Sequence, residues 1–245
     1  MHVALLSSRR DLYGGEVHVR DLARGLQARG HRVTCLVRPR SALARVLDRD
    51  GLDVRRLRLG SALDPRSVAE LALTLRRLRP DVLHSHCPPD YFLAATASLG
   101  SPVCNVATRH QLRPISALWG KRPLMNRFAA MIAVSEAVRD GLLAAGFPAR
   151  QVVAVLNGIP AAGPGDPPAS LRRELGLDSA CGPVVGYVGR LSREKEPELL
   201  LEAAALLGGR WPGLQIVLIG GDGGNDQRTR QLRELGRSLG LSVRI

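Results

Sequence analysis

The chain has 245 residues, of which 45% are hydrophobic and only 3% aromatic, so its core must be built mainly from Leu, Val and Ala. It lacks a run of eighteen apolar residues, which excludes a membrane-spanning helix of ordinary length. The net charge is +13 and is uneven, because residues 1–165 carry 24 Lys and Arg against 12 Asp and Glu, whereas residues 166–245 carry 11 against 10. The first part therefore suits an anionic partner, such as a phosphorylated sugar lipid or an acidic membrane surface. Nucleic acid is disfavoured, since stacking aromatics are scarce and no nucleic-acid motif is present.

Short apolar segments alternate with amphipathic helical segments along the chain, a pattern typical of a parallel α/β sheet. Strands are predicted over His2–Ser7, His31–Val37, Asp53–Leu57, Asp81–His86, Pro102–Ala107, Ala129–Val134, Val152–Leu156, Val184–Val188, Leu214–Ile219 and Ser242–Ile245. Helices are predicted over Glu16–Arg29, Asp64–Arg79, Glu136–Ala145, Glu194–Leu207 and Gln227–Leu239, with a Pro-, Gly- and Ala-rich linker at residues 160–170.

Two glycines, Gly14 and Gly15, separate the first strand from the first helix. Glycines just before a helix let a ligand approach the backbone where the helix N-terminus favours an anion. An ordinary turn at the start of a helix is the alternative. The G-x-G-x-x-G pattern of dinucleotide-binding folds is absent here, which disfavours an NAD enzyme.

Three histidines lie at predicted strand ends. His84 and His86 fall on one side of their strand, and with no third ligand nearby they make a weak metal site. A structural role for this pair is at least as plausible. Thr108-Arg109-His110 closes the next strand, where the carboxyl ends of parallel strands line a binding crevice.

Two further patterns are interpreted without a metal. Asp48-Arg49-Asp50 matches the D-x-D pattern of some metal-binding sites but lies at a helix end, so a solvated turn is predicted. The four cysteines, Cys35, Cys87, Cys104 and Cys181, show no C-x-x-C spacing and are expected to be buried free thiols.

Residues 111–128 mix cations with Trp, Leu and Phe, which suits either a membrane interface or a helix that packs on its own sheet.

The segment Val184–Lys195 combines a short apolar strand, a tight loop at Gly189 and the start of a helix. Arg190 and Lys195 place two cations beside a helix N-terminus, which together make a suitable clamp for a diphosphate. An ordinary strand-to-helix loop with solvated charges is the alternative.

The Gly189-Arg190-x4-Lys195 pattern resembles the donor-phosphate motif of retaining glycosyltransferases of family 4, which have the GT-B fold. Further matches to that family occur in the same order along nearly the whole chain. They are Gly14-Gly15-x-x-His18, Gly30-His31-x-Val33, His84-Ser85-His86, Thr108-Arg109-His110, Val134-Ser135, Asn157-Gly158-Ile159 and Gly220–Gly223.

This resemblance implies an α/β fold of GT-B type. Residues 1–165 would form a complete Rossmann-like acceptor-side domain, and residues 166–245 the first half of a second, nucleotide-sugar-binding Rossmann-like domain. The paired-glutamate motif of the family is not found. We therefore expect either a fragment of a longer protein or a decayed copy.

The resemblance also implies an activity: transfer of a sugar, with retention, from a nucleotide-diphosphate sugar to a hydroxyl of a glycan or lipid-linked acceptor. No cofactor or metal would be required. The expected catalytic residues are His110, Arg190 and Lys195; the donor-binding residues are Gly14, Gly15, Gly189, Gly221, Asp222 and Gly223; the acceptor-side residues are His84 and His86.

The expected setting is lipopolysaccharide or surface polysaccharide synthesis in the cytoplasm, with peripheral attachment to the inner face of the membrane. Two alternatives remain open. One is a nucleotide-sugar epimerase of the same fold. The other, if the chain truly ends at Ile245, is an inactive basic domain that binds a membrane surface.

Overall fold

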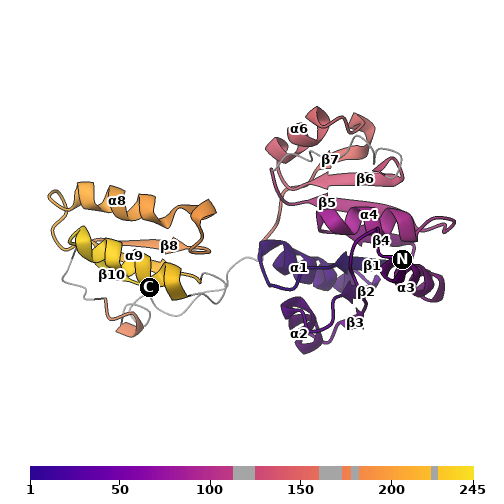
Figure 1. Ribbon diagram of the computed structural model, residues 1–245, viewed down its shortest axis with the longest axis horizontal. Coiled ribbons are helices and arrows are strands. Elements are labelled where there is room, and N and C mark those ends of the chain that lie inside the picture. The colour runs from indigo at the N-terminus through magenta and orange to yellow at the C-terminus, as the bar shows by residue number, and fades with distance from the viewer. Residues whose placement is uncertain (113–124, 160–172, 178–181, 222–225) are drawn as a thin grey trace. The chain divides into compact units, whose positions relative to one another are not determined.

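The computed structural model describes residues 1–112, 125–159, 173–177, 182–221 and 226–245, and divides the chain into two compact units, Met1–Ile159 and Pro160–Ile245 (Figure 1). The predicted boundary between residues 165 and 166, and the predicted linker around it, lie outside the described residues, as does most of the mixed segment 111–128.

The first unit is built on a seven-stranded sheet in the order β3-β2-β1-β4-β5-β6-β7, and every neighbouring pair is parallel. The predicted α/β class is therefore confirmed. The strands are β1 (His2–Ser7), β2 (Arg32–Val37), β3 (Asp53–Arg56), β4 (Val82–Ser85), β5 (Cys104–Arg109), β6 (Phe128–Ala133) and β7 (Val152–Ala154).

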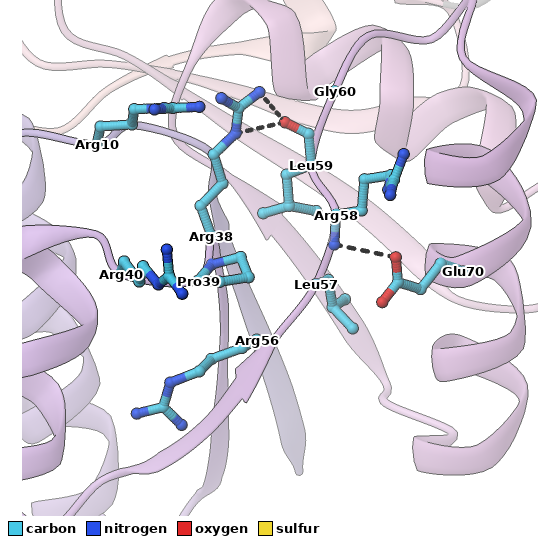
Figure 2. Close-up of a pocket in the computed structure, with 10 residues that line it drawn as sticks. All are labelled: Arg10, Arg38, Pro39, Arg40, Arg56, Leu57, Arg58, Leu59, Gly60 and Glu70. Carbon is cyan, nitrogen blue, oxygen red and sulfur yellow. Dashed lines mark hydrogen bonds between the residues drawn. The ribbon is translucent and has the colours of Figure 1, made fainter.

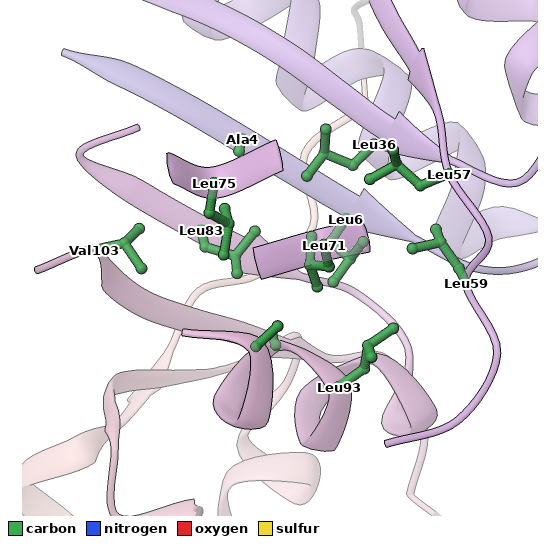
Figure 3. Close-up of a cluster of buried hydrophobic side chains, with 12 residues drawn as sticks. Ala4, Leu6, Leu36, Leu57, Leu59, Leu71, Leu75, Leu83, Leu93 and Val103 are labelled. Atoms are coloured by element: carbon green, nitrogen blue, oxygen red, sulfur yellow. The ribbon is translucent and has the colours of Figure 1, made fainter. Parts of the chain in front are cut away.

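Helices cover both faces of this sheet, because alternate residues of each strand point to opposite sides and both sides are apolar. Ala4 and Leu6 of β1 pack with the helices on one face (Figure 3), and Val3 and Leu5 pack with those on the other. The helices are α1 (Gly14–Ala28), α2 (Ala42–Arg49), α3 (Pro65–Leu78), α4 (Pro88–Ala97), α6 (Glu136–Ala144) and the 3-10 turn η1 (Ala149–Gln151).

The second unit contains a three-stranded parallel sheet in the order β10-β9-β8. Leu201, Ile216, Leu218 and Leu232 are at its core. Its elements are β8 (Val184–Val188), η2 (Arg193–Lys195), α8 (Pro197–Leu207), β9 (Gln215–Ile219), α9 (Asp226–Ser238) and β10 (Ser242–Arg244).

Several predictions differ from the structure in detail. Strand β5 extends two residues beyond the predicted Ala107, so Thr108 and Arg109 are buried within it. Cys104 is exposed, contrary to the expectation for all four thiols, because it opens that strand at the rim of the sheet; Cys35 and Cys87 are buried as predicted. No described helix combines the length and apolar character needed to cross a bilayer.

Candidate functional site

The sheet of the first unit reverses its direction of growth between β1 and β4, since the chain adds β2 and β3 on one side and β4 and β5 on the other. In open parallel sheets the carboxyl ends of the strands at such a reversal form the usual ligand crevice. The β1–α1 loop, the start of α1 at Gly14 and Gly15, and His86 directly after β4 lie at this point.

Gly14 and Gly15 form the first turn of α1, whereas the helix was predicted to open at Glu16. The first N–H groups of a helix have no partner within it and favour an anion. A Cβ placed on Gly15 would lie 3.8 Å from Cδ2 of His110, so this turn faces that imidazole directly, whereas a Cβ on Gly14 would meet nothing within 4 Å.

Four imidazoles gather beside this turn. The ring centroids of His84 and His86 are 4.2 Å apart, those of His18 and His110 are 5.0 Å apart, and His86 lies 5.7 Å from His18 and 5.8 Å from His110. We call this set, which comes from α1, β4 and the ends of β4 and β5, the histidine cluster.

Burial holds the histidine cluster neutral. Desolvation, followed by repulsion from the neighbouring imidazoles, lowers the pKa of His84 to about 3 and of His110 to about 4, and holds the pKa of His86 well below its usual value. Burial also lowers the pKa of His18. Across the physiological pH range these rings therefore present both a donor and a lone pair.

Some of these nitrogens have no partner among the described residues. His84 is engaged, with Nε2 2.7 Å from the hydroxyl of Thr108. In contrast, both ring nitrogens of His86 and Nε2 of His110 are buried without a hydrogen bond to any described group. Buried imidazole nitrogens usually find a partner, so the cluster is arranged to receive one.

The arrangement is suited to two kinds of partner. Ligand atoms of His18, His86 and His110 all lie within 4.8 Å of one another, so these three side chains could hold a transition-metal ion. The same neutral imidazoles could hydrogen-bond the hydroxyl groups of a sugar. The sequence-based view that no third ligand lies near His84 and His86 is wrong, because the fold brings α1 and the end of β5 alongside them.

A buried carboxylate supports the turn that carries the glycines. Glu16 is 2% exposed, accepts a hydrogen bond from the Tyr13 backbone N–H at 3.0 Å, and lies 3.9 Å from Arg9. Burial raises its pKa. Glu16 thereby fixes the start of α1 against the loop that follows β1.

Two side chains of helix α4 hold the carboxyl ends of β1 and β5 in place by hydrogen bonds. The Tyr91 hydroxyl donates to the Thr108 carbonyl at 2.6 Å, and the Ser8 N–H donates to the Asp90 carboxylate at 2.9 Å. Asp90 is fully buried, and desolvation raises its pKa to about 6.

In the second unit, the loops after β8 and β9 lie against each other. The Gly189 N–H donates to the Ile219 carbonyl at 2.9 Å, and the Leu191 N–H donates to the Gly221 carbonyl at 3.1 Å. Gly220 has a φ of 156°, and a Cβ placed on it would overlap the Gly189 carbonyl oxygen. Only glycine fits at position 220. The hydrogen bonds of Gly189 and Gly221, two predicted donor-binding residues, join the two loops to each other.

The two predicted cations flank these loops. Arg190 is exposed and forms an ion pair with Glu194 at 3.1 Å, and Lys195 is exposed in η2. The α-helix begins at Pro197 rather than near Glu194, because Glu196 adopts a left-handed φ of 43° in front of the proline. Asp222 and Gly223 lie outside the described residues.

The Asp48-Arg49-Asp50 turn ends α2, and both carboxylates are used in ion pairs. Asp50 binds Arg20 at 2.5 Å and Asp48 pairs with Arg56. A solvated turn was predicted here; Asp48 is exposed, whereas Asp50 is half-buried because it pairs with Arg20.

Comparison with known proteins assigns the chain to a family. The model of Glycosyltransferase Family 4 matches residues 13–162, which is more than half of the chain. The chain belongs to glycosyltransferase family 4. The sequence resemblance is thereby confirmed.

The curated relatives of this family 4 chain include two kinds of enzyme. It is 44% identical over 85 residues to a D-inositol 3-phosphate glycosyltransferase of Nocardia farcinica, covering 34% of this chain and 18% of the relative. It is 34% identical over 161 residues to an alpha-maltose-1-phosphate synthase of Mycolicibacterium smegmatis, covering 57% of this chain and 40% of the relative. The chain thus spans less than half the length of these relatives.

Solved structures extend the likeness to the whole family 4 chain. Anabaena HepE, solved in complex with UDP-glucose, matches all of it with a TM-score of 0.81 and 22% identity, and a Rickettsia africae glycosyltransferase matches with a TM-score of 0.83 and 17% identity. The chain covers 68% and 67% of these two proteins. The predicted fold of GT-B type is confirmed by these matches.

Proposed function

We propose that this protein transfers a glycosyl group from a nucleotide-diphosphate sugar to an acceptor hydroxyl with retention at the anomeric carbon. Family membership supports glycosyl transfer. The joined loops after β8 and β9 carry the proposal, because they set Arg190 and Lys195 beside a rigid glycine turn.

Arg190 and Lys195 would stabilise the departing diphosphate. Charge accumulates on that group as the glycosidic bond breaks, and positive groups fixed beside it lower the barrier. Arg190 is paired with Glu194. An exposed pair of this kind contributes only about 0.2–1 kcal/mol, so a diphosphate can displace the carboxylate. These cations would replace a metal ion in this scheme.

The histidine cluster would bind sugar hydroxyls. His110, neutral and with a buried unpartnered Nε2, would orient the transferred sugar, and His84 and His86 would lie on the acceptor side. Gly14 and Gly15 would let the donor approach the first N–H groups of α1.

The acceptor would be a glycan or lipid-linked sugar of a surface polysaccharide or lipopolysaccharide, modified in the cytoplasm at the inner face of the membrane. The strongly basic charge of residues 1–165 supports an anionic setting of this kind.

Donor binding tests the proposal. UDP-glucose, ADP-glucose and GDP-mannose are titrated into the 245-residue chain by calorimetry, and the preferred donor is carried forward. Arg190→Ala with Lys195→Ala should weaken its binding at least tenfold, because charge-assisted hydrogen bonds contribute about 1.5–3 kcal/mol each. Glu194→Gln should bind at least as tightly as the wild type.

Arg210→Ala with Arg237→Ala is the matched control, since it removes two exposed cations of the same unit away from the joined loops. Equal donor affinity in both double variants would contradict the clamp. Product analysis without acceptor separates an epimerase, which would convert the donor sugar, from a transferase, and NMR of the transferred anomeric proton tests retention.

A further inference from the structure

A second basic site lies at the same edge of the sheet as the histidine cluster, in a hollow of about 810 Å³ (Figure 2). Five arginines line it, and we call it the arginine pocket. They come from the ends of three neighbouring strands: Arg10 follows β1, Arg38 and Arg40 follow β2, Arg56 ends β3 and Arg58 follows it.

The positive charge of the arginine pocket is poorly balanced. The lining contains one acid, Glu70, whose carboxylate accepts the Arg58 backbone N–H at 3.0 Å. Arg56 pairs with Asp48, and the Asp64 carboxylate attracts Arg58. Within the described residues, no carboxylate pairs with Arg10 or Arg40.

The walls of the pocket are fixed. The Arg38 guanidinium donates twice to the Leu59 carbonyl, once from Nε at 2.6 Å, which joins the ends of β2 and β3 (Figure 2). The Ala42 N–H donates to the Arg10 carbonyl at 2.8 Å, which joins the loop after β1 to the start of α2.

Arg40 itself is held in an unusual conformation. Its φ is 59°, a left-handed value that a non-glycine residue adopts at a cost of about 1–2 kcal/mol. The following Ser41 caps α2 through a hydrogen bond from the Ala44 N–H at 3.1 Å, which keeps this bend in place. Strained backbone conformations of this kind cluster at binding and active sites.

Exposed guanidinium groups on a fixed frame favour phosphate over carboxylate as the bound group. A guanidinium fork pairs with two oxygens of either group, but a phosphate offers more oxygens and so can bind several arginines at once. An organised frame also reduces the entropy lost on binding.

The distance to the histidine cluster sets the size of the ligand. Arg10 follows β1, next to β4, but the other four arginines follow or end β2 and β3. Neighbouring strands are about 4.8 Å apart, so the ends of β2 and β3 lie roughly 10 Å and roughly 14 Å from the end of β4. A phosphate ester of one sugar places its phosphorus only a few bonds from the ring, which is too short to reach both places.

We propose that the arginine pocket binds a phosphate group of an extended acceptor, such as a phosphorylated oligosaccharide or a glycan linked through phosphate to a lipid, whose reactive hydroxyl reaches the histidine cluster. This inference rests on the proposed function, because it states where a second part of the proposed acceptor, its phosphate group, binds.

The test compares two double variants with the same net charge, Arg40→Gln with Arg58→Gln and the control Arg77→Gln with Arg150→Gln. All four side chains are exposed, and the control arginines lie outside the pocket. Both are made in an Arg190→Ala, Lys195→Ala background, so that the donor-phosphate residues do not contribute to binding. Thermal unfolding and circular dichroism confirm that each variant is folded.

Two probes distinguish the sources of phosphate. Inorganic pyrophosphate is titrated at low salt by calorimetry, and co-flotation is measured with vesicles of phosphatidic acid in phosphatidylcholine. The pocket variant should bind at least tenfold more weakly than the control. A loss confined to vesicles assigns a lipid headgroup, and a loss with pyrophosphate assigns a soluble phosphorylated acceptor.

Equal binding of both probes by the pocket and control variants would overturn the proposal. Failure of the proposed function gives a different result: no nucleotide sugar binds the unmodified chain, while pyrophosphate binding still depends on Arg40 and Arg58.

Discussion

At the scale of single residues, the histidine cluster has the most distinctive chemistry of the first unit. Its rings are neutral because they are buried together, and neutrality is what lets an imidazole donate to one hydroxyl and accept from another. Protonation would replace the lone pairs with positive charges in one small volume.

This burial predicts that the protein loses stability in mild acid. Where the folded pKa of a histidine lies below the unfolded value of about 6.5, the unfolded chain binds the proton first, so the free energy of unfolding decreases as pH falls below that value. His18, His84, His86 and His110 all act in this direction. The midpoint temperature of thermal unfolding should therefore be lower at pH 5 than at pH 7.

Two acids oppose the histidines. The raised pKa values of Asp90 and Glu16 mean that the folded state binds their protons first, which adds stability as pH falls. The four histidines outnumber them. His86→Asn should reduce the difference in midpoint between pH 7 and pH 5, and His31→Asn, outside the cluster, serves as the control. An unchanged difference in the His86 variant would contradict this account.

At the scale of elements, the joined loops of the second unit depend on one backbone position. A Cβ on Gly220 would overlap the Gly189 carbonyl oxygen and lie 2.8 Å from its carbon, whereas a Cβ on Gly221 would meet nothing within 4 Å. The two adjacent glycines therefore make a matched pair for mutation.

Gly220→Ala should destabilise the second unit by about 1–3 kcal/mol, because the loops must move apart to admit the methyl group. Gly221→Ala should change its stability by less than about 0.5 kcal/mol. Hydrogen exchange of the β8 and β9 amides measures both effects. Equal protection in the two variants would mean that the loops are not held as closely as described.

How far the elements could be predicted depended on their periodicity. Helices α1 and α3 have one apolar face, which the spacing of their leucines and valines reveals. Helix α4 was missed because it is apolar on most sides, buries Asp90 and opens with two prolines, so it shows neither a helical face nor a standard cap. Helix α2 is indicated by the sequence only at its end, Asp48–Asp50.

The candidate site was predictable where motifs carry it, and less so where tertiary contacts create it. His84, His86 and His110 were identified from strand ends and from the family pattern. The sequence does not mark His18 as a site residue, because only the tertiary fold brings this residue of α1 beside His86. The arginine pocket had no motif at all, since its five side chains converge only through strand order.

At the scale of the whole molecule, each of the two units has its own hydrophobic core, and the two units differ in net charge. Three buried clusters consist only of first-unit residues, and the fourth consists only of second-unit residues. Nearly all the excess positive charge is also in the first unit, as the counts for residues 1–165 show.

Calorimetry should therefore resolve two unfolding transitions with different salt dependence. Raising NaCl from about 0.01 M to about 0.15 M shortens the Debye length from about 30 Å to about 8 Å and screens like-charge repulsion. The transition of the first unit should move to higher temperature, and that of the second should change little. Hydrogen exchange assigns each transition, and a single transition at both salt concentrations would contradict independent cores.

The gathering of histidines also makes the protein easy to observe. The whole chain contains six histidines, and four of them belong to one cluster. Imidazole ring protons resonate apart from most other signals, so a carbon–proton correlation spectrum of histidine-labelled protein is largely a spectrum of this site. Its peaks would follow hydroxyl or metal binding directly, without any dye, tag or enzymatic turnover.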